Sequence, residues 1–210
     1  MILTRAVWLA AAAVLVAGPA SACMGDKVLF EDRFDQPNPG WGKYLKNRVV
    51  IGGGAMKVTP EPKRRQFVQY RGDLYGDADV CVDITVPALR SEGAAGLLFG
   101  YEDYVGFNFF WVNAPGGLAG IDRWSDTASK WLHPVNSRKV AGLDVSGGAK
   151  VALRLTLNGT RAISYINNKE FVQFKVSPTE LGGFIGLEAE AGETSGTWIF
   201  NNFKITNLPR

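Results

Sequence analysis

Two glutamates near the C-terminal end of the chain have the spacing that acid–base chemistry on a sugar bond requires. Glu188 and Glu190 are separated by one alanine. In a β-strand, residues i and i+2 point to the same face about 6–7 Å apart, and glycoside hydrolysis uses two carboxylates that flank the bond. The chain then turns through Ala191-Gly192, which would aim Glu193 at solvent. The sequence therefore offers Glu188 and Glu190 as a candidate acid pair.

Other catalytic and metal-binding motifs are missing from the sequence. His133 is the single histidine, and it precedes Pro134 in a segment that we expect to be a solvated loop. The sequence contains neither a G-x-S-x-G motif nor a C-x-x-C motif. A Ser-His-Asp triad would have to use this loop histidine, and a zinc site lacks the histidines and paired cysteines that it needs.

Aromatic side chains give the stronger indication of a binding site. Trp124 and Trp131 flank the polar stretch 125–130, which we expect to be an exposed loop. Rings beside Arg123 suit a ligand pocket, because such pockets combine apolar walls with a few polar groups. A sugar offers an apolar C–H face to a ring and hydroxyls to the polar side chains. The alternative is that each tryptophan covers an edge of the core.

The sequence GFNFFWVN, which starts at Gly106, is apolar on both faces of a strand. A buried amide without partners costs a few kcal/mol, so Asn108 should face a groove that offers water and ligand hydroxyls. We therefore predict that Asn108 and Phe110 line a ligand groove, with Arg123 close by on the next antiparallel strand. The alternate side chains should be core: Phe107, Phe109 and Trp111.

Short alternating runs separated by Gly and Asn position these residues, and no sustained helical period interrupts them. Two turns, Asn158-Gly159 and Asn167-Asn168, predict successive hairpins. This spacing indicates an all-β antiparallel sandwich or barrel in one domain, residues 23–210. The expected strands are 28–34, 48–51, 55–59, 66–71, 80–86, 95–101, 105–113, 118–124, 150–157, 160–166, 170–176, 183–190 and 197–207.

Residues 1–22 have the order of a secretory signal peptide. Arg5 is followed by an apolar run and by Ala20-Ser21-Ala22, a small-residue cleavage site. We expect a secreted or periplasmic chain that starts at Cys23. No stretch is long and apolar enough for a transmembrane helix. The formal net charge of +3 is too small to argue for nucleic acid.

Two cysteines, Cys23 and Cys81, remain after this cleavage. In an exported chain the simplest interpretation is one disulfide, with Cys81 on the strand face opposite Val80 and Val82. The alternative is a lipoprotein acylated on Cys23, although the preceding residues lack the usual leucine of a lipobox.

Several motifs, in order along nearly all of residues 23–210, resemble the concanavalin A-like lectin and glucanase superfamily. The similarity extends to its laminin-G-like modules and to its 3-keto-glycoside hydrolase, family-16-like domains. The motifs are FEDRF at 30–34, AGLLFG at 95–100 followed by Tyr104, SYINNKEF at 164–171, GFIGL at 183–187 and FNNFKI at 200–205.

The resemblance implies a jelly-roll sandwich of two curved antiparallel sheets, one of which holds sugar chains in many members. Family-16 enzymes carry an E-x-D-x-x-E strand in mid-chain, whereas the similar E-x-E-x-x-E here lies near the C-terminus. Relatives often hold calcium through an acidic residue at the position of Asn201, where the amide weakens such a site. Asp32 and its acidic neighbours could compensate, but no cofactor is otherwise indicated.

Together these features favour an exported β-sandwich that binds a carbohydrate or glycan ligand without cleaving it. The main alternative is a glycoside hydrolase that acts on a sugar or keto-sugar derivative through Glu188 and Glu190. A third is an envelope module that contacts other proteins. The fold supports all three, because it hosts enzymes and binders alike.

Overall fold

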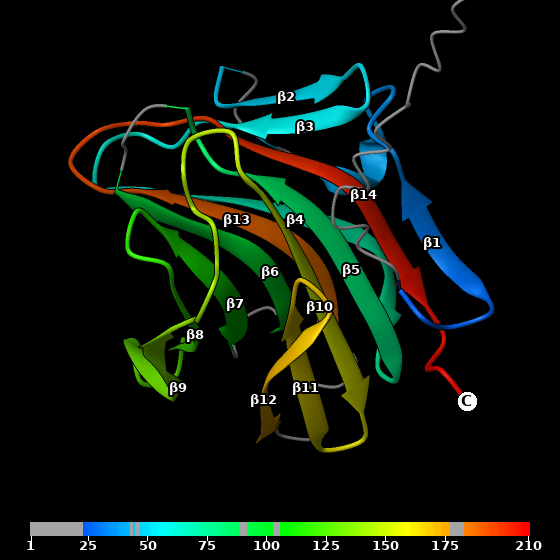
Figure 1. The fold of residues 1–210 in the computed structure, drawn as a ribbon. Coiled ribbons are helices and arrows are strands. Elements are labelled where there is room, and N and C mark those ends of the chain that lie inside the picture. Colours follow the sequence, from blue (N-terminus) through cyan, green and yellow to red (C-terminus); the bar gives the residue numbers. More distant parts are fainter. Residues whose placement is uncertain (1–22, 43, 45–46, 89–91, 103–105, 177–182) are drawn as a thin grey trace, which may run out of the picture.

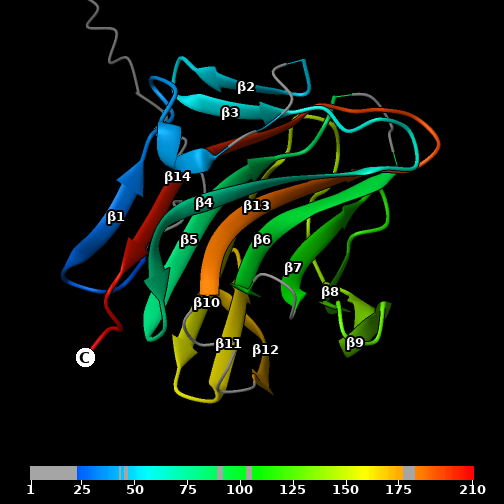
Figure 2. The ribbon, with the colours of Figure 1, turned by 180° about the vertical axis from the view of Figure 1, so that it is seen from behind.

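We describe a computed structural model that covers residues 23–210, except 43, 45–46, 89–91, 103–105 and 177–182. The expected signal peptide and Tyr104 lie outside the described residues. Within them the chain forms fourteen strands and one short 3-10 helix, η1 (Pro39–Trp41). The strands make two antiparallel sheets that pack face to face, one in front in Figure 1 and the other in front in Figure 2.

The sheet in front in Figure 1, here called sheet A, has the strand order β12-β11-β10-β5-β14-β3-β2, and β1 pairs with β14. It therefore contains both the first strand, β1, and the last strand, β14. Its strands are β1 (Val28–Asp32), β2 (Val49–Gly52), β3 (Ala55–Val58), β5 (Ala78–Thr85), β10 (Lys150–Asn158), β11 (Arg161–Ile166), β12 (Lys169–Lys175) and β14 (Trp198–Thr206).

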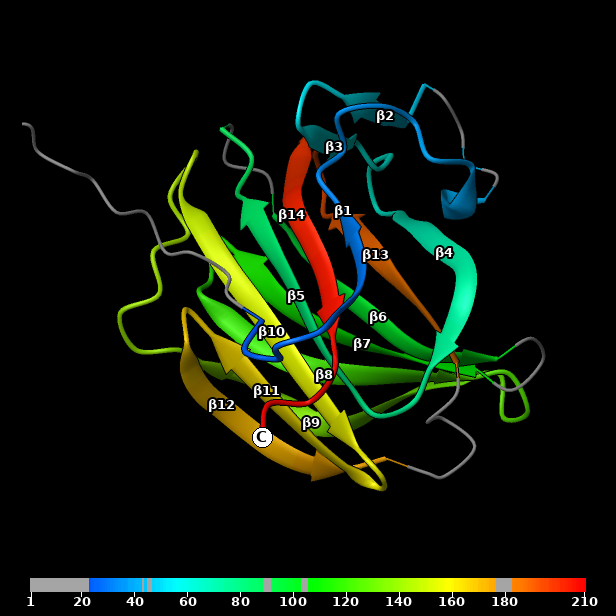
Figure 3. The same ribbon diagram turned by 90° about the vertical axis from the view of Figure 1, so that its right-hand side faces the viewer.

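The second sheet, sheet B, has the order β4-β13-β6-β7-β8-β9 and lies behind sheet A in Figure 1. Figure 3 shows the two layers from the side, with β5, β10 and β14 in front of β6 and β7. The strands of sheet B are β4 (Arg65–Tyr75), β6 (Gly93–Glu102), β7 (Gly106–Ala114), β8 (Leu118–Ser125), β9 (Lys130–Lys139) and β13 (Gly183–Ala191).

The predicted strands agree with the observed ones except at β9. This segment was expected to be loop, but it pairs with β8, and Trp124 is directly opposite Trp131. Alternation is weak in β9 because it is an edge strand with mostly exposed side chains. The first predicted turn is shifted by one residue, since Asn158 pairs with Arg161 and ends β10. The second turn is as predicted, with positive φ angles at Asn167 and Asn168.

The main hydrophobic core lies between the two sheets. Alternate residues of the inner strands supply it, for example Val80, Val82 and Ile84 of β5. Trp198 is buried there, as predicted, and so is Trp41 of η1. No helix of the described residues is long and apolar enough to cross a membrane.

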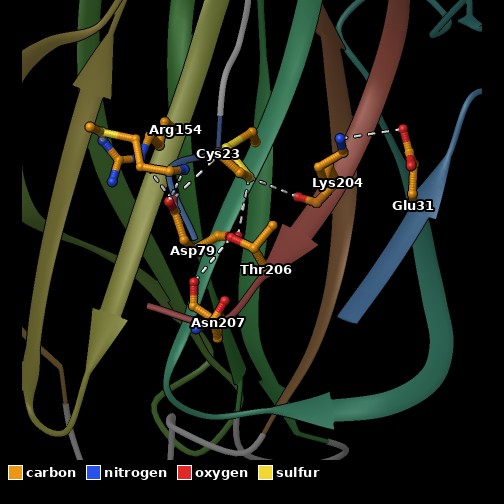
Figure 4. Close-up of a disulfide and its surroundings, with 9 residues drawn as sticks. Cys23, Glu31, Asp79, Arg154, Lys204, Thr206 and Asn207 are labelled. Atoms are coloured by element: carbon orange, nitrogen blue, oxygen red, sulfur yellow. Dashed lines mark hydrogen bonds and ion pairs between the residues drawn. A yellow bond between two sulfur atoms is a disulfide. The ribbon is translucent and has the colours of Figure 1, made fainter. Parts of the chain in front are cut away.

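The predicted disulfide is present on the side of sheet A that faces away from this core. Cys23 and Cys81 are bonded, with their Cα atoms 5.6 Å apart (Figure 4). The buried Asp79 next to the bridge accepts a hydrogen bond from Arg154 at 2.8 Å and another from the backbone N–H of Met24 at 2.8 Å. The bridge and Asp79 therefore fasten the N-terminal segment to β5. On the chain-entropy model a loop of this length contributes about 4 kcal/mol.

Candidate functional site

The face of sheet B that points away from the main core, here called the outer face, is also apolar. Phe110 and Val112 of β7 belong to the main core, whereas Phe107 and Phe109 form a second cluster on the outer face. Trp111 packs against this second cluster. The face assignment that the sequence suggested for β7 is therefore wrong, because the two sets of residues are exchanged.

The error came from the argument about Asn108. This side chain is 2% exposed on the inner side of the sheet, and it is not without a partner there. Arg123 is directly opposite Asn108 on β8, as predicted, and shares the inner side with Ile121 of the main core. A polar residue in an otherwise apolar strand thus marks no surface by itself, since a buried amide with partners is tolerated.

The outer face is strongly concave. Strands β4 and β9 are the two edges of sheet B, yet the guanidinium carbon of Arg65 on β4 lies 4.0 Å from the ring centroid of Trp131 on β9. The ring centroids of Phe67 on β4 and Phe107 on β7 are 5.2 Å apart, and the rings meet edge to face. Six strands laid flat would separate these edges by about 24 Å. The sheet must therefore curl until its edge side chains meet over its centre.

Arg65 joins two carboxylates beneath this contact. Its Nη1 donates to Glu188 Oε1 at 3.0 Å, and its Nη2 lies 3.0 Å from Glu190 Oε2. Both glutamates come from β13 and point to the outer face because they are two residues apart. Glu188 is fully buried, whereas Glu190 is about one-third exposed. Glu193, by contrast, is exposed and pairs with Lys63, so the third acid of the sequence motif lies elsewhere, as predicted.

The environment of Glu188 changes its acidity. Burial raises its pKa to about 8, Arg65 opposes the rise, and the charges of Glu190 and Asp122 add to it. Glu188 is therefore largely protonated at neutral pH, and the second carboxyl contact of Arg65 is with Glu190. Since Glu188 Oε1 accepts from Arg65, the proton belongs on Oε2.

Asp122 and His133 add two more polar side chains to the outer face, besides Arg65, Glu188 and Glu190. Asp122 is on β8, directly opposite Phe109, and its Oδ1 lies 2.7 Å from His133 Nδ1. The sequence placed His133 in a solvated loop, but it lies in β9 with a half-exposed ring held by this contact. A carboxylate that holds one ring nitrogen leaves the other one directed to solvent or ligand.

Three buried side-chain atoms of the described residues have no hydrogen-bond partner, and all three belong to the outer face: Gln69 Nε2, Trp111 Nε1 and Glu188 Oε2. Each comes from a different strand. In the register of the sheet, Gln69 opposes Gly186, while Glu188 and Trp111 both oppose Gly96. An unsatisfied buried polar atom costs about 1–3 kcal/mol. Their concentration on one face indicates a surface that is completed by a hydrogen-bonding ligand or by water.

A hollow of about 300 Å³ opens on the outer face, and of the three residues with an unpartnered atom Trp111 lines it. Phe109 and Trp111 form its apolar wall, and its charged lining consists of Arg65, Glu92, Asp122 and Glu190. Gly120 leaves room for the indole, because a Cβ there would lie 2.8 Å from Trp111 Cζ2. Hollows of about 220 Å³ near Phe171 and Arg154 contain none of the three unpartnered atoms.

The five predicted binding residues do not form one site. Trp124 and Trp131 pack against each other on the outer face, with ring centroids 5.3 Å apart and ring planes tilted by 59°. Asn108, Phe110 and Arg123 lie on the inner side and do not reach the hollow.

Four residues of the outer face were not predicted as members of the site: Arg65, Gln69, Trp111 and Asp122. Arg65 follows Lys63 and Arg64, and three consecutive basic residues are typical of a solvated loop. Its alternation with Phe67 and Gln69 was the available signal, because all three share one face of β4.

The residues proposed for calcium have other contacts. Asp32 accepts hydrogen bonds from the backbone N–H of Phe34 at 2.7 Å and from Trp41 Nε1 at 2.8 Å. The Nδ2 of Asn201 donates to the Gly54 carbonyl oxygen at 2.5 Å. Asp32 is thus bonded to Phe34 and Trp41, and Asn201 to the turn at Gly54.

Comparison with known proteins identifies the fold. No family model matches the chain, and no curated protein matches it. Among solved structures, the carbohydrate-binding module CBM66 from Bacillus subtilis is similar, with a TM-score of 0.58 and 19% identity over 72% of this chain and 86% of that chain. A glycoside hydrolase family 16 protein of the Bacteroides ovatus mixed-linkage glucan locus has a TM-score of 0.63 and 15% identity over 85% and 100%.

The β-glucanase of Bacillus licheniformis is similar to the same degree, with a TM-score of 0.62 and 12% identity over 85% of this chain and 97% of that chain. Likeness at these identities concerns the fold. The chain therefore has the concanavalin A-like jelly roll that its sequence motifs indicated.

Proposed function

We propose that this protein binds a carbohydrate on the outer face of sheet B. The observation that carries the proposal is the set of three unpartnered buried atoms, which lie among aromatic rings on one concave surface. Two of them are N–H donors, and the third carries the proton of Glu188 at neutral pH. Unpartnered donors on this face, with Trp111 Nε1 at the hollow itself, suit a ligand that is rich in hydroxyl and ether oxygens.

The aromatic wall supports the same ligand class. Sugar rings present apolar C–H faces, which pack on indole and phenyl rings, while their hydroxyls need polar partners at the rim. Trp111 offers both features, because it lines the hollow and its Nε1 has no protein partner. Arg65 and Glu190 add a charged donor and a charged acceptor beside it. The similar solved structures, a carbohydrate-binding module and sugar-chain hydrolases by their titles, are consistent with this ligand class.

Hydrolysis of a glycoside or a keto-sugar derivative is the second candidate function. The raised pKa of Glu188 favours it, because a protonated acid beside an ionised one is the division of labour that glycosidases use. Glu188 would protonate the leaving oxygen, and Glu190 would act as base or nucleophile. The contact of both carboxylates with one guanidinium favours the binding function, since Arg65 stands where a substrate bond would have to lie.

A glycan array followed by calorimetry on the purified domain separates these functions, when a reducing-end assay is run on the same ligands. Binding without release of reducing ends supports the principal proposal. Release that disappears in Glu188→Gln and Glu190→Gln would establish the hydrolase instead. A protein that neither binds nor cleaves any glycan would contradict both and favour a module that contacts other proteins.

We also propose that the chain is exported and works outside the cytoplasm, in the periplasm or the medium. The order of residues 1–22 supports export, and a disulfide such as Cys23–Cys81 persists in oxidising compartments. A sulfur in that bond is not available for acylation. Mass spectrometry of the exported protein should give a chain that begins at Cys23 and has no free thiol. A diacylglycerol mass on Cys23 would replace the soluble form with a lipoprotein.

A further inference from the structure

We propose that the hollow on the outer face receives the terminal unit of a glycan chain and does not accept an internal segment. This inference rests on the proposed carbohydrate-binding function and specifies its ligand. It follows from the shape of the curled sheet, which is filled by side chains at one end and open at the other.

Contacts between the sheet edges close one end. The ring centroids of Phe67 and Phe107 are 5.2 Å apart, and those of Phe107 and Trp131 are 5.7 Å apart. Both pairs pack edge to face. Trp131 in turn lies under Arg65 at 4.0 Å. Phe109 belongs to the same cluster, and its ring has no exposed surface although it points away from the main core. A chain that entered along the outer face would have to stop at this cluster.

The other end lies where the central strands of sheet B begin and finish. The hollow is lined by Gly93, the first residue of β6, by Asn113 near the end of β7, and by Gly192 just after β13. Asn113 and Gly192 are partly exposed at this end, and Glu92 beside them is exposed. With about 300 Å³, the hollow has the size of the smallest ligand pockets, which suits one sugar unit better than a run of several.

The charges of the lining restrict the chemistry of that unit. Glu92, Asp122 and Glu190 supply three carboxyl groups, against one guanidinium from Arg65. Arg65 is already engaged by Glu188 and Glu190, so little positive potential is left for an anion. A uronic acid or a sulfated sugar would bring a like charge into this hollow. The terminal unit should therefore be neutral or carry an amine.

Titration calorimetry with oligosaccharides of one to six units tests the inference. The probes are linear β-1,3-glucans, β-1,4-glucans, β-2,6-fructans and chitosan oligomers, with oligogalacturonates as the anionic series and cyclic glucans as ligands without ends. For the series that binds, we expect affinity to level off by two units, within about threefold up to six. Cyclic glucans and oligogalacturonates should not bind. A rise of more than about tenfold between two and six units, or binding of a cyclic glucan, would overturn chain-end recognition.

The variant Trp131→Ala tests the closed end directly. Removing this indole should open the outer face, so that the hexamer gains affinity over the dimer by at least about fivefold. Leu132→Ala is the matched control, because the neighbouring side chain is exposed and belongs to neither cluster. Circular dichroism checks that both variants fold. If wild-type protein and a folded Trp131→Ala variant show the same length dependence, the cluster does not limit the ligand and the inference is wrong.

Failure of the inference can be distinguished from failure of the proposed function. A wild-type protein that binds no member of any series contradicts carbohydrate binding itself, and the inference falls with it. A wild-type protein that binds longer chains progressively better, or binds cyclic glucans, still binds carbohydrate, and then only chain-end recognition is refuted.

Discussion

The inner and outer faces of sheet B differ in how their polar groups are satisfied. On the inner face, the apolar side chains of β7 pack against sheet A, and the buried Asn108 has a partner. On the outer face, equally apolar rings surround Gln69 Nε2, Trp111 Nε1 and Glu188 Oε2, none of which has one. Among the described residues, the buried side-chain atoms without a hydrogen-bond partner therefore all lie on the outer face.

This difference is the one that the proposed function requires between a surface that serves folding and a surface that binds a ligand. A core gains stability from every contact and tolerates few unsatisfied polar atoms. The outer face retains three of them and a carboxyl group whose pKa burial has raised. Substitutions on the two faces should therefore have different consequences, and the following predictions test that contrast.

The largest effect is expected from emptying the inner face. Phe110→Ala should lower the free energy of unfolding by about 3–5 kcal/mol, because the void is sealed between two sheets. Phe109→Ala should cost less, since Phe109 borders the hollow and water can enter the space. Only Phe109→Ala should weaken sugar binding in protein that remains folded. Chemical denaturation and calorimetry measure both quantities, and equal or reversed stability losses would remove the distinction between the faces.

The next effect concerns the pH dependence of stability. The pKa of Glu188 is about 8 in the folded protein, against a usual value of 4.5, so the folded state holds this proton more tightly than the unfolded state. The stabilisation from Glu188 is complete below about pH 4.5 and is lost as the pH rises towards 8. Glu188→Gln keeps a neutral side chain at every pH. Its stability relative to wild type should therefore increase between pH 5 and pH 9, by on the order of a few kcal/mol.

Glu193→Gln is the control for this experiment, because Glu193 is exposed in its ion pair with Lys63. It should leave the pH profile of stability unchanged. Denaturation in urea at pH 5, 7 and 9 compares the three proteins. If the stability of Glu188→Gln depends on pH in the same way as that of wild type, the fold does not keep Glu188 protonated. Glu188 then does not distinguish the outer face from the inner face.

Much of the architecture could be predicted from the sequence, because its signals are local. Alternation placed thirteen of the strands, and Asn167-Asn168 placed a hairpin turn. The alternation of Val80, Cys81 and Val82 also placed Cys81 on the face away from the core, where the disulfide is found. Each of these features depends on a few neighbouring residues and on the two-residue period of a strand.

The site could not be predicted in the same way, because it depends on the curl of the sheet. Arg65 and Trp131 are on opposite edges, and no periodicity relates two strands that meet only when the sheet bends. The same bend gives Phe109 a buried position outside the main core, and for this reason the two faces of β7 could not be told apart from composition. Glu188 and Glu190 were recognised from their spacing, but the environment that separates their roles was not.

A smaller effect should distinguish two tryptophan N–H groups. Trp111→Phe removes an N–H that has no partner, so stability should stay constant or rise by about 1 kcal/mol, while sugar binding weakens. Trp41→Phe removes an N–H that donates to the buried Asp32, so stability should fall by about 1–3 kcal/mol. The same substitution thus has opposite effects on stability. A clear loss of stability in Trp111→Phe would mean that its N–H already serves the free protein.

The smallest effect is expected at Gly120, which lies beneath the indole of Trp111. A Cβ at this position would stand 2.8 Å from Trp111 Cζ2, so Gly120→Ala must displace the ring from its place in the hollow. Stability should change by less than about 1 kcal/mol, because the strand gains from losing a glycine what it loses in the contact. Sugar affinity should fall severalfold. In a Trp111→Phe background the clashing atom is missing, so Gly120→Ala should then have no effect on affinity, and this double-mutant cycle measures the coupling. Equal losses of sugar affinity in both backgrounds would mean that Gly120 affects the ligand independently of Trp111. The indole would then not be the ligand contact through which Gly120 acts.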